Sequence, residues 1–434
     1  MTQWSILDTW IVIVGSLCAA ACALPGTLLV LRKMSMMGDA ISHTVLAGLA
    51  IAFLVTHRRD PATMFVGAVV IGLVTALLIQ LVGSLGRTEI GASMGIVFTS
   101  LFAMGLVLMR QAIDHVEIDP DCVLYGAIEA SYFDQITWMG MNLPRAAIIN
   151  GGAGIFNLLL IVVLYKEFKV SAFDPALSTT LGINANVMHY LLMTMTAVTT
   201  VAAFETVGSI LVIAMLIVPP ATAYLLTDRL SFMMCWSVLL AILAAIFGHV
   251  SAVTVPTWFG FGGTSTAGMM AFCAGLIFVA VWLLAPRHGV LSKVFHRCIL
   301  QLRIVREDVL GLLYRLEELP PSHELSTTPA LLQGILGVGP VLSTLAVSSL
   351  ARRGYIEHRS GQLHLTNQGR RAGRHLIRSH RLWESFLQKH LHLASDHVHE
   401  PAEQLEHITD AAMQNQLAER TNQPQTDPHG KKIP

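Results

Sequence analysis

The chain has 434 residues, of which 53% are hydrophobic and 13% are charged, and its formal net charge is zero. With a mean hydropathy of +0.60, this composition excludes an ordinary soluble globular protein, in which about a quarter of the residues are charged. The charges are unevenly placed, because residues 1–286 hold 24 of the 56 charged side chains and the shorter segment 287–434 holds 32. The sequence therefore predicts a polytopic membrane domain followed by a water-soluble domain.

The first apolar run, residues 10–31, is long enough to span a bilayer and ends at Arg32-Lys33. It is a spanning helix rather than a cleavable signal peptide, because residues 1–9 lack a basic region. Further runs of spanning length lie near residues 41–56, 62–82, 91–109, 148–165, 188–204, 207–226, 232–250 and 267–285. The short second run and the Pro219-Pro220 pair leave the number of spans at eight or nine.

Basic residues between the runs indicate the orientation of the membrane domain. The larger set lies at Arg32-Lys33, Arg87, Lys166, Lys169, Arg229, Arg287 and Lys293, and the smaller set at Arg58-Arg59, Arg110 and Arg145. Since cytoplasmic loops are rich in Lys and Arg, residues 165–187 and the C-terminal part should share the cytoplasmic side. The side of the N-terminus depends on the number of spans and stays open.

Ionisable residues inside a bilayer are costly, so those within spans are candidates for function. They are Asp39, His43, Glu205 and His249, with His189 at the edge of a span. Asp39 and His43 are four residues apart and share one helix face, a spacing that suits a common divalent ion. Alternatively, Asp39 caps its own helix and His43 bonds to a neighbouring helix, and the spacing alone does not decide between the two.

A polar segment, residues 165–187, interrupts the apolar runs. Within it, Asp174 suits a helix N-cap, Pro175 and Ala176 suit the first turn, and Gly182 suits the position after the helix ends. We therefore expect a short helix on the cytoplasmic side.

Three segments carry a resemblance: MSMMGDAISHTVLAGLA (34–50), FDPALSTTLGI (173–183) and VGSILVIAMLIVPPATAYLL (207–226). Together they resemble the permease family of manganese, zinc and iron ABC importers. The resemblance implies a pore built with a second permease copy or a paralogous permease, with Asp39 and His43 on the metal path. It also implies that the short helix at 174–182 couples to a separate ABC ATPase subunit, and that an extracytoplasmic metal-binding protein delivers the ion.

Two features qualify this resemblance. The chain has no G-x-x-x-x-G-K-[ST] phosphate loop, so it is expected to be a transport subunit and not an enzyme. Glu205 stands where a neutral or basic residue is expected, and it is either a further metal ligand or a carboxyl that packs helices.

The soluble part begins with a predicted linker, 287–305, and continues as a winged helix. We expect a helix at 310–319, two helices at 328–336 and 343–353 around a turn, and a β-hairpin at 354–366. The second helix of the pair would enter a DNA major groove. Its polar side chains for DNA are Ser343, Thr344, Ser348, Arg352 and Arg353, which suit phosphate contact better than base readout because Asn, Gln and an early Arg are lacking.

Ten of the 18 histidines follow residue 350, and Glu403, Glu406 and His407 form an E-x-x-E-H group on one helix face. Such a group can converge on one cation, although a helix rich in Glu and His is also typical of a solvated face. The segments LTNQGRRAGRHLIRSHRLWESFLQKHL and HVHEPAEQLEHITDAAMQNQL resemble the iron- and manganese-dependent repressor family over residues 306–417. That resemblance implies a principal metal site of Asp308, His380, Glu403, Glu406 and His407, with Glu384 and His399 as ancillary ligands.

Oxygen and imidazole donors without thiolate favour Mn²⁺ first, with Fe²⁺ or Zn²⁺ as alternatives. Where the family has an SH3-like module, this chain has only a predicted polar tail, 418–434. The fold class is thus an all-α polytopic membrane protein of eight or nine transmembrane helices with a C-terminal, mostly α winged-helix domain.

The resulting hypothesis is a divalent-metal permease of the cell (inner) membrane, 1–286, with a cytoplasmic metal-responsive domain, 306–417. An alternative is a membrane-tethered metal-dependent transcriptional regulator whose permease part is an anchor or receptor. A third possibility keeps transport and makes the soluble domain an allosteric gate that no longer binds DNA. The excess of four basic residues in 287–434 does not decide between DNA and anionic membrane lipid as its partner.

Overall fold

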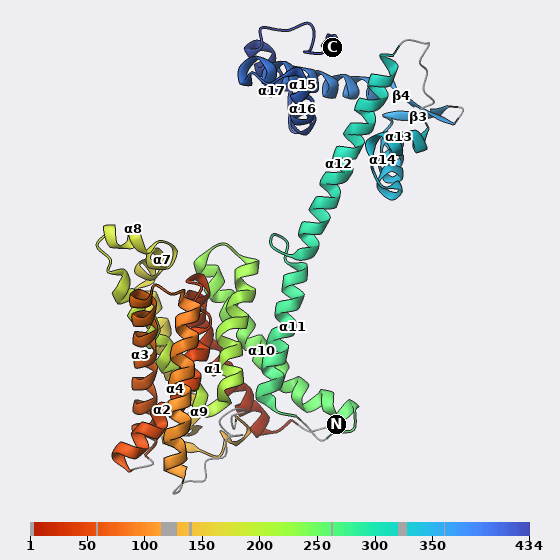
Figure 1. The fold of residues 1–434 in the computed structure, drawn as a ribbon. Helices are drawn as coiled ribbons and strands as arrows, with labels where there is room; N and C mark the ends of the chain where they lie inside the picture. Colours follow the sequence, from red (N-terminus) through yellow and green to blue (C-terminus); the bar gives the residue numbers. More distant parts are fainter. Residues whose placement is uncertain are drawn as a thin grey trace. The chain divides into compact units, whose positions relative to one another are not determined.

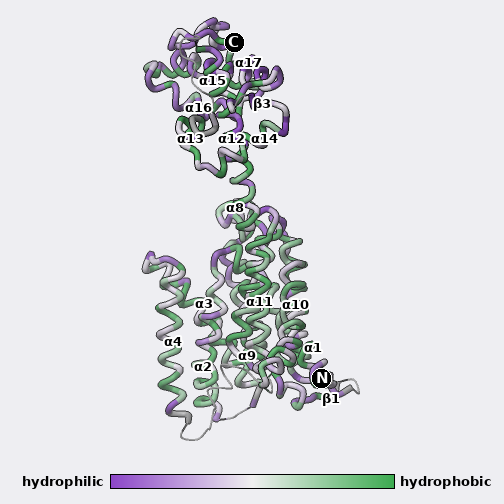
Figure 2. Tube along the Cα trace, turned by 90° about the vertical axis from the view of Figure 1, so that its right-hand side faces the viewer, coloured by the Kyte–Doolittle hydropathy of each residue, from purple (hydrophilic) through white to green (hydrophobic). Residues whose placement is uncertain are grey.

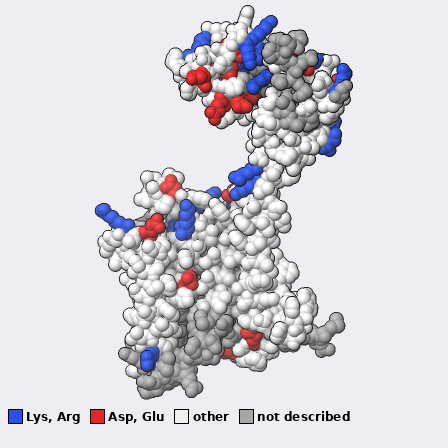
Figure 3. Space-filling model, turned by 45° about the vertical axis from the view of Figure 1, so that its right-hand side comes forward, with Lys and Arg blue, Asp and Glu red and all other residues white. Residues whose placement is uncertain are grey.

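The computed structural model describes residues 4–57, 60–113, 128–138, 141–261, 264–319, 328–359 and 361–434. The chain forms two compact units, Met1–Ser292 and Lys293–Pro434 (Figure 1). In the view of Figure 3, charged side chains gather on the second unit, while the sides of the helical bundle in the first unit are almost free of them. This division agrees with the change in charge density along the sequence.

The first unit is a bundle of apolar helices, drawn largely in green in Figure 2. Its helices are α1 (Ile6–Leu31), α2 (Met37–Thr56), α3 (Pro61–Gly86), α4 (Ile90–Ile113), α6 (Arg145–Val163), α7 (Tyr165–Phe173), α8 (Pro175–Thr180), α9 (Ala185–Leu226), α10 (Leu230–Trp258) and α11 (Thr266–Leu284). A 3₁₀ turn, η1 (Ile128–Ala130), precedes strands β1 (Gln135–Trp138) and β2 (Met141–Pro144), which pair antiparallel. Among the residues described, eight helices are long and apolar enough to cross a membrane.

Small residues bring the helices of the bundle close together. A Cβ atom added to Gly26 of α1 would lie 2.1 Å from the carbonyl oxygen of Leu216 in α9. At Gly248 of α10, an added Cβ would lie 2.3 Å from the Cα atom of Met270 in α11. Only glycine fits either position, as is common where membrane helices approach each other closely.

Helix α9 is folded back on itself at Gly208, whose φ of 76° and ψ of 170° lie outside the helical region. His189, near the start of α9, contacts Arg32 at the end of α1, and Leu216 contacts Gly26 of the same helix. In a straight helix His189 and Leu216 would be about 40 Å apart, whereas Gly26 and Arg32 are separated by only about 9 Å of α1. The two halves of α9 therefore make two passes, as the separate runs 188–204 and 207–226 predicted, and the described helices make nine passes in all.

The reversal also fixes which segments share a side of the bundle. Both ends of α9 lie on one side, so α8 and Asp228 lie there too. Asp228 is bonded to Arg287 (3.3 Å) and His288 (3.2 Å), which follow α11. This agrees with the prediction that 165–187 and the C-terminal part share a side. With nine passes, α1 begins on the opposite side.

The second unit contains all but the first three residues of α12 (Val290–Glu317). Its other helices are α13 (Pro329–Leu336), α14 (Pro340–Arg352), α15 (Asn367–Leu391), η3 (Ser395–His397), α16 (His399–Glu406) and α17 (Ala411–Arg420). Strands β3 (Ile356–Arg359) and β4 (Gln362–Leu365) form a hairpin with Ile356 opposite Leu365. The predicted helix pair and β-hairpin of a winged helix are thus present.

The segment predicted as a linker, 287–305, is helical from Val290, and the helix expected at 310–319 forms the end of the same helix, α12. The stretch 290–305 contains neither Pro nor Gly, so nothing in it breaks a helix. Further along α12, Val309 is fully buried and Leu313 is 2% exposed, and both belong to the core that α12 shares with the winged helix.

Residues 418–434, predicted as a polar tail, are packed against α15. Helix α17 continues to Arg420, and Ile433 joins a small core with Leu382 and Leu417. Arg378 of α15 donates a hydrogen bond to the carbonyl oxygen of Pro434 at 2.7 Å. The polar composition of this segment concealed the packing, because backbone carbonyls, the Asp427 carboxylate and the apolar side chains of Ala418 and Ile433 make these contacts.

Candidate metal sites

In the membrane unit, Asp39 and His43 lie on successive turns of α2. The Asp39 Oδ1 and His43 Nε2 atoms are 3.3 Å apart, and the two side chains are 29% and 32% exposed. The rings of Phe98 and Phe102 in α4 lie 5.7 and 5.5 Å from the His43 ring, centroid to centroid. Within the described part of the chain, no third potential metal-ligating residue joins this pair. An ion held here would need additional ligands from elsewhere.

The other ionisable residues of the spans have polar partners between helices. Glu205 forms an ion pair with Arg145 at 3.4 Å, which joins α9 to α6 and favours the helix-packing alternative for this carboxyl. His249 of α10 bonds to Asp8 of α1 at 3.2 Å. His189 contacts Arg32, whose guanidinium also donates to the Ser171 carbonyl in α7.

The short helix predicted from residues 174–182 is present as α8. Asp174 Oδ1 accepts hydrogen bonds from the backbone N–H groups of Ala176 (3.0 Å) and Leu177 (2.9 Å), and Pro175 is the first helical residue. Gly182 follows the helix at a φ of +82°, which a side chain would strain. The N-cap, the proline and the glycine therefore all stand where the sequence predicted them.

The helix α8 and its flanks expose a row of large apolar side chains. Phe173 is 61% exposed, Leu177 49% and Leu181 61%. An exposed apolar cluster on a polar loop is typical of a protein contact.

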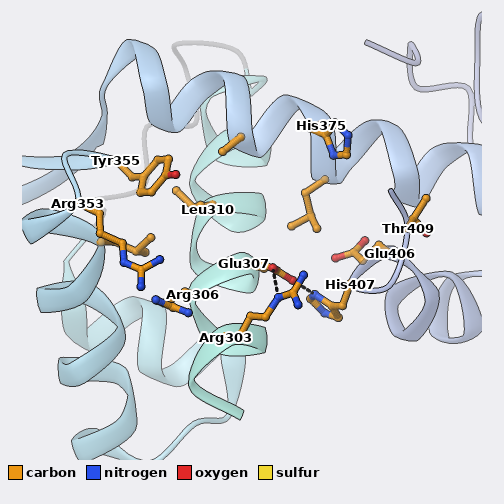
Figure 4. Close-up of a pocket in the computed structure, with 13 residues that line it drawn as sticks. Arg303, Arg306, Glu307, Leu310, Arg353, Tyr355, His375, Glu406, His407 and Thr409 are labelled. Atoms are coloured by element: carbon orange, nitrogen blue, oxygen red, sulfur yellow. Dashed lines mark hydrogen bonds and ion pairs between the residues drawn. The ribbon is translucent and has the colours of Figure 1, made fainter. Parts of the chain in front are cut away.

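In the second unit, Asp308 of α12 meets Glu406 and His407 at the end of α16, with ligand atoms within 4.8 Å of one another. His407 Nε2 lies 3.2 Å from Asp308 Oδ1. The Nδ1 atom of His407 lies 2.8 Å from Glu307 Oε2, a contact drawn in Figure 4. Burial alone would lower the pKa of His407, but hydrogen bonds to Asp308 and Glu307 raise it to about 10. Burial would raise the pKa of Glu307, but hydrogen bonds from His407 and Arg303 hold this pKa below its usual value.

Glu307 was missing from the predicted site, although it is adjacent to Asp308 in the sequence. Its position is decided by how α12 meets α16, a packing that the sequence does not show. Glu403, in contrast, was predicted as a principal ligand and lies outside this cluster. Glu403 stands one turn before Glu406 on α16, where its side chain is exposed. It lines a cavity of about 430 Å³ together with Asp308 and His407.

A second cluster joins His380 and Glu384 of α15 to His399 of α16. His380 Nε2 is 3.0 Å from Glu384 Oε1 and 3.0 Å from His399 Nδ1, while His399 Nδ1 is 2.9 Å from the same Glu384 oxygen. Burial would raise the pKa of Glu384, but hydrogen bonds from the two histidines lower it to about 2. Glu384 is therefore an anion at any pH near neutrality.

His380, predicted as a principal ligand, lies between the two clusters. Its Nδ1 atom is 2.6 Å from Glu406 Oε2, and both side chains are 4% exposed. Neither atom makes a hydrogen bond of acceptable geometry, which is rare for buried polar groups. Buried carboxylate and imidazole groups that lack such a hydrogen bond are suited to bind a divalent cation.

A cavity of about 530 Å³ separates the first cluster from the winged helix (Figure 4). Glu406 and His407 line one end, and Arg353 and Tyr355 line the other. Arg306 of α12 also faces it and donates to the Ser349 hydroxyl of α14 at 3.4 Å. The cavity therefore lies between the metal-ligand cluster and the winged helix.

The predicted DNA-contacting residues are only partly available. Ser343 is 1% exposed and faces the core with Ala346 and Val347, so it does not reach a DNA groove. Thr344 and Ser348 use their hydroxyls on carbonyls of their own helix.

Arg352 and Arg353 are both exposed at the end of α14. The surface of α14 thus offers charge for phosphates and little for bases.

Comparison with known proteins identifies the family of the membrane unit. Residues 6–285 match the model of the ABC 3 transport family. The chain belongs to this family. It is 43% identical over 287 residues to the manganese transport system membrane protein MntD of Bacillus subtilis, covering 66% of this chain and 95% of that protein.

A second relative resembles most of the chain. The manganese transport system membrane protein MntC of Bacillus subtilis is 30% identical over 400 residues, which are 91% of this chain and 86% of that protein. The structure of PsaBC from Streptococcus pneumoniae in complex with Fab superposes with a TM-score of 0.55 at 29% identity, over 67% of this chain and 96% of that one. As a member of the ABC 3 transport family, the chain is a multi-pass membrane protein, and the residues that follow α11 are cytoplasmic.

Residues 366–434 match the iron dependent repressor, metal binding and dimerisation domain. The match contains His380, Glu384, His399, Glu406 and His407, and it extends through the packed C-terminal segment. A permease of the ABC 3 transport family is therefore joined here to a metal-binding domain of repressor type.

Proposed function

We propose that this chain is the permease subunit of an ATP-driven importer of divalent metal ions, with Mn²⁺ as the favoured ion. The contact between Asp39 and His43 inside α2 carries this proposal. A carboxylate and an imidazole suit a first-row divalent ion, and retaining both within a span is costly. Two relatives of this chain in Bacillus subtilis are manganese transport proteins, which supports Mn²⁺ as the first choice.

The partial exposure of Asp39 and His43 supports a pore made with a second permease, either another copy or a paralogue. Two ligands are too few for Mn²⁺, which prefers about six donors. Donors from the second permease, from water or from backbone carbonyls would complete the shell. An extracytoplasmic binding protein would deliver the ion on the side where α1 begins.

The apolar row on α8 supports docking to a separate ATPase subunit. Phe173, Leu177 and Leu181 form a cytoplasmic patch, which a partner would cover. ATP hydrolysis in that partner would then open and close the metal path through α8 and the helices joined to it.

For the second unit, we propose a metal-responsive regulator of transport. Ion binding at the two clusters would draw α12, α15 and α16 together, and the cavity of Figure 4 lies between them and the winged helix. The buried Ser343 and the short supply of base-reading side chains on α14 favour this allosteric gate over a membrane-tethered transcriptional regulator.

The test is ion-by-ion uptake in a strain that lacks the transporter and receives this chain with its ATPase and binding protein. Mn²⁺ should accumulate faster than Zn²⁺ or Fe²⁺, and a chain without 293–434 should still transport but should lose its response to cytoplasmic metal. Unchanged uptake of all three ions on adding the system would contradict the permease assignment. Metal-dependent retention of promoter DNA by the full chain would favour the transcriptional alternative.

A further inference from the structure

The last residues of the chain form a tight turn with a buried carboxylate at its centre. Asp427 Oδ1 accepts hydrogen bonds from the backbone N–H groups of His429 (2.9 Å) and Lys431 (2.8 Å). Gly430 supplies the positive φ of 81° that the turn needs, and Thr426 pairs with Lys432 as an isolated β-bridge. The turn is therefore defined by its backbone and by Asp427, and the imidazole of His429 takes no part in it.

Helix α15 holds this turn in place through Arg381. The Arg381 guanidinium lies 3.6 Å from the Asp427 carboxylate and donates to the Lys432 carbonyl at 2.5 Å. The side chain of Arg381 is 4% exposed, and it is also paired with Glu318 of α12. The residue before Arg381 is His380, so the helix that carries two ligands of the second cluster also anchors the turn.

This anchoring brings His429 to the second cluster. Its Nε2 atom lies 3.8 Å from Glu384 Oε1, the same oxygen that contacts His380 and His399. A separation of 3.8 Å is too long for a hydrogen bond. Donor atoms about 2.1 Å from one ion are separated by about 3.0 Å at a right angle and about 3.4 Å at the tetrahedral angle. The separations of 2.9 and 3.0 Å around Glu384 Oε1 match that spacing, and the 3.8 Å separation of His429 exceeds it by about 0.4 Å.

We propose that His429 is the fourth ligand of a metal site formed with His380, Glu384 and His399. This inference rests on the proposal that the second unit binds divalent cations. The turn then acts as a lid that supplies a ligand from the very end of the chain.

Three imidazoles and one carboxylate favour ions later in the first-row series, such as Zn²⁺ or Co²⁺, over Mn²⁺. The first cluster has the opposite balance, because His407 is its one imidazole and Asp308, Glu406 and the adjacent Glu307 are carboxylates. The two sites should therefore differ in metal preference, with the oxygen-rich site taking Mn²⁺ and the imidazole-rich site taking the later ion.

The experiment is a Co²⁺ titration of the purified full-length protein in detergent, followed by the visible d–d absorption of the ion. Wild-type protein should develop the intense bands of a four-coordinate Co²⁺ site, and Zn²⁺ should displace them. His429→Asn should lose these bands or bind Co²⁺ at least about tenfold more weakly, since even the loss of an outer partner costs that much. His364→Asn is the matched control, because His364 is exposed on β4 and should leave the spectrum unchanged.

His429→Cys distinguishes a ligand from a residue needed only for folding. A thiolate at this position should add a sulfur-to-Co²⁺ charge-transfer band in the near ultraviolet, which a change in packing alone would not produce. Hydrogen exchange of residues 427–434 should also slow on adding Zn²⁺ in wild type and not in His429→Asn.

If His429→Asn keeps the wild-type spectrum and affinity, or His429→Cys shows no charge transfer, His429 is not a ligand and the inference is wrong. If the wild-type protein binds none of Co²⁺, Zn²⁺ and Mn²⁺, the proposed sensor fails together with this site. Binding in wild type with unaltered variants refutes the fourth ligand alone.

Discussion

Binding of Mn²⁺ to the cluster of Asp308, Glu406 and His407 should release a proton, because His407 is protonated in the metal-free protein. Its pKa is raised to about 10 by hydrogen bonds to Asp308 and Glu307, against the opposing effect of burial. A metal ligand must be a neutral imidazole, so the ion has to displace this proton at any pH below about 10. One released proton changes the affinity about tenfold per pH unit, or about 1.36 kcal/mol.

Lowering the pH from 8.5 to 6.5 should therefore weaken Mn²⁺ binding about 100-fold through His407 alone. Burial would lower the pKa of His380, but its contacts with Glu384 and Glu406 raise it. Because Glu406 belongs to this cluster, the slope should steepen where His380 becomes protonated as well. The stability of the metal-free protein has the opposite pH dependence. A raised pKa contributes stability that is complete below about 6.5, the unfolded value, and is lost as the pH rises toward 10.

The assay is isothermal titration calorimetry of the full-length protein with Mn²⁺ at one pH in buffers of different ionisation enthalpy. The dependence of the observed heat on buffer should give about one proton released per ion at pH 7.5. Glu307→Gln should reduce that number by lowering the pKa of His407. A heat that does not depend on the buffer, together with an affinity that is constant between pH 6.5 and 8.5, would refute this description of the cluster.

Three further outcomes follow from the structure. Leu177→Asp should uncouple ATP hydrolysis from transport while metal binding to the purified protein stays unchanged, and a cross-link from Leu177 should reach the ATPase subunit. Gly208→Ala should cost about 1–3 kcal/mol, because its φ of 76° is strained for a side chain, and the measurement is the loss of folded protein in detergent on heating. Ser343→Ala should leave DNA retention and stability nearly unchanged, because the Ser343 hydroxyl is buried without a hydrogen-bond partner, and a normal melting temperature would confirm it.

Local signals in the sequence predicted much of the membrane unit. Apolar runs gave the spans, and the order of Asp174, Pro175 and Gly182 gave the ends of α8, because each of these features depends only on near neighbours. The reversal of α9 stayed open, since the runs 188–204 and 207–226 are separated only by Glu205 and Thr206 and a glycine at position 208 is also compatible with a straight helix. Only the contacts of His189 and Leu216 with α1 distinguish the two.

The resemblance to the repressor family predicted most of the candidate metal residues, but it did not predict which of them lie together. His380 and Glu384 are four apart on α15, so their contact could be foreseen, whereas the distance from Glu307 to His407 depends on how α12 meets α16. His429 was missed because it lies 45 residues after Glu384 in the chain and because its neighbours are polar. Long-range placement of this kind is decided by packing, which spacing along the chain does not reveal.

The central claim is that the Asp39–His43 pair lies on the path of a transported divalent ion. It is tested most directly by ATP-driven Mn²⁺ uptake into liposomes that contain this chain and its ATPase subunit, with delivery by the binding protein. Asp39→Asn and His43→Ala should each abolish uptake at normal levels of assembled complex, while His57→Ala, at the exposed end of the same helix, should transport as wild type does. Normal uptake in either of the first two variants would contradict the claim.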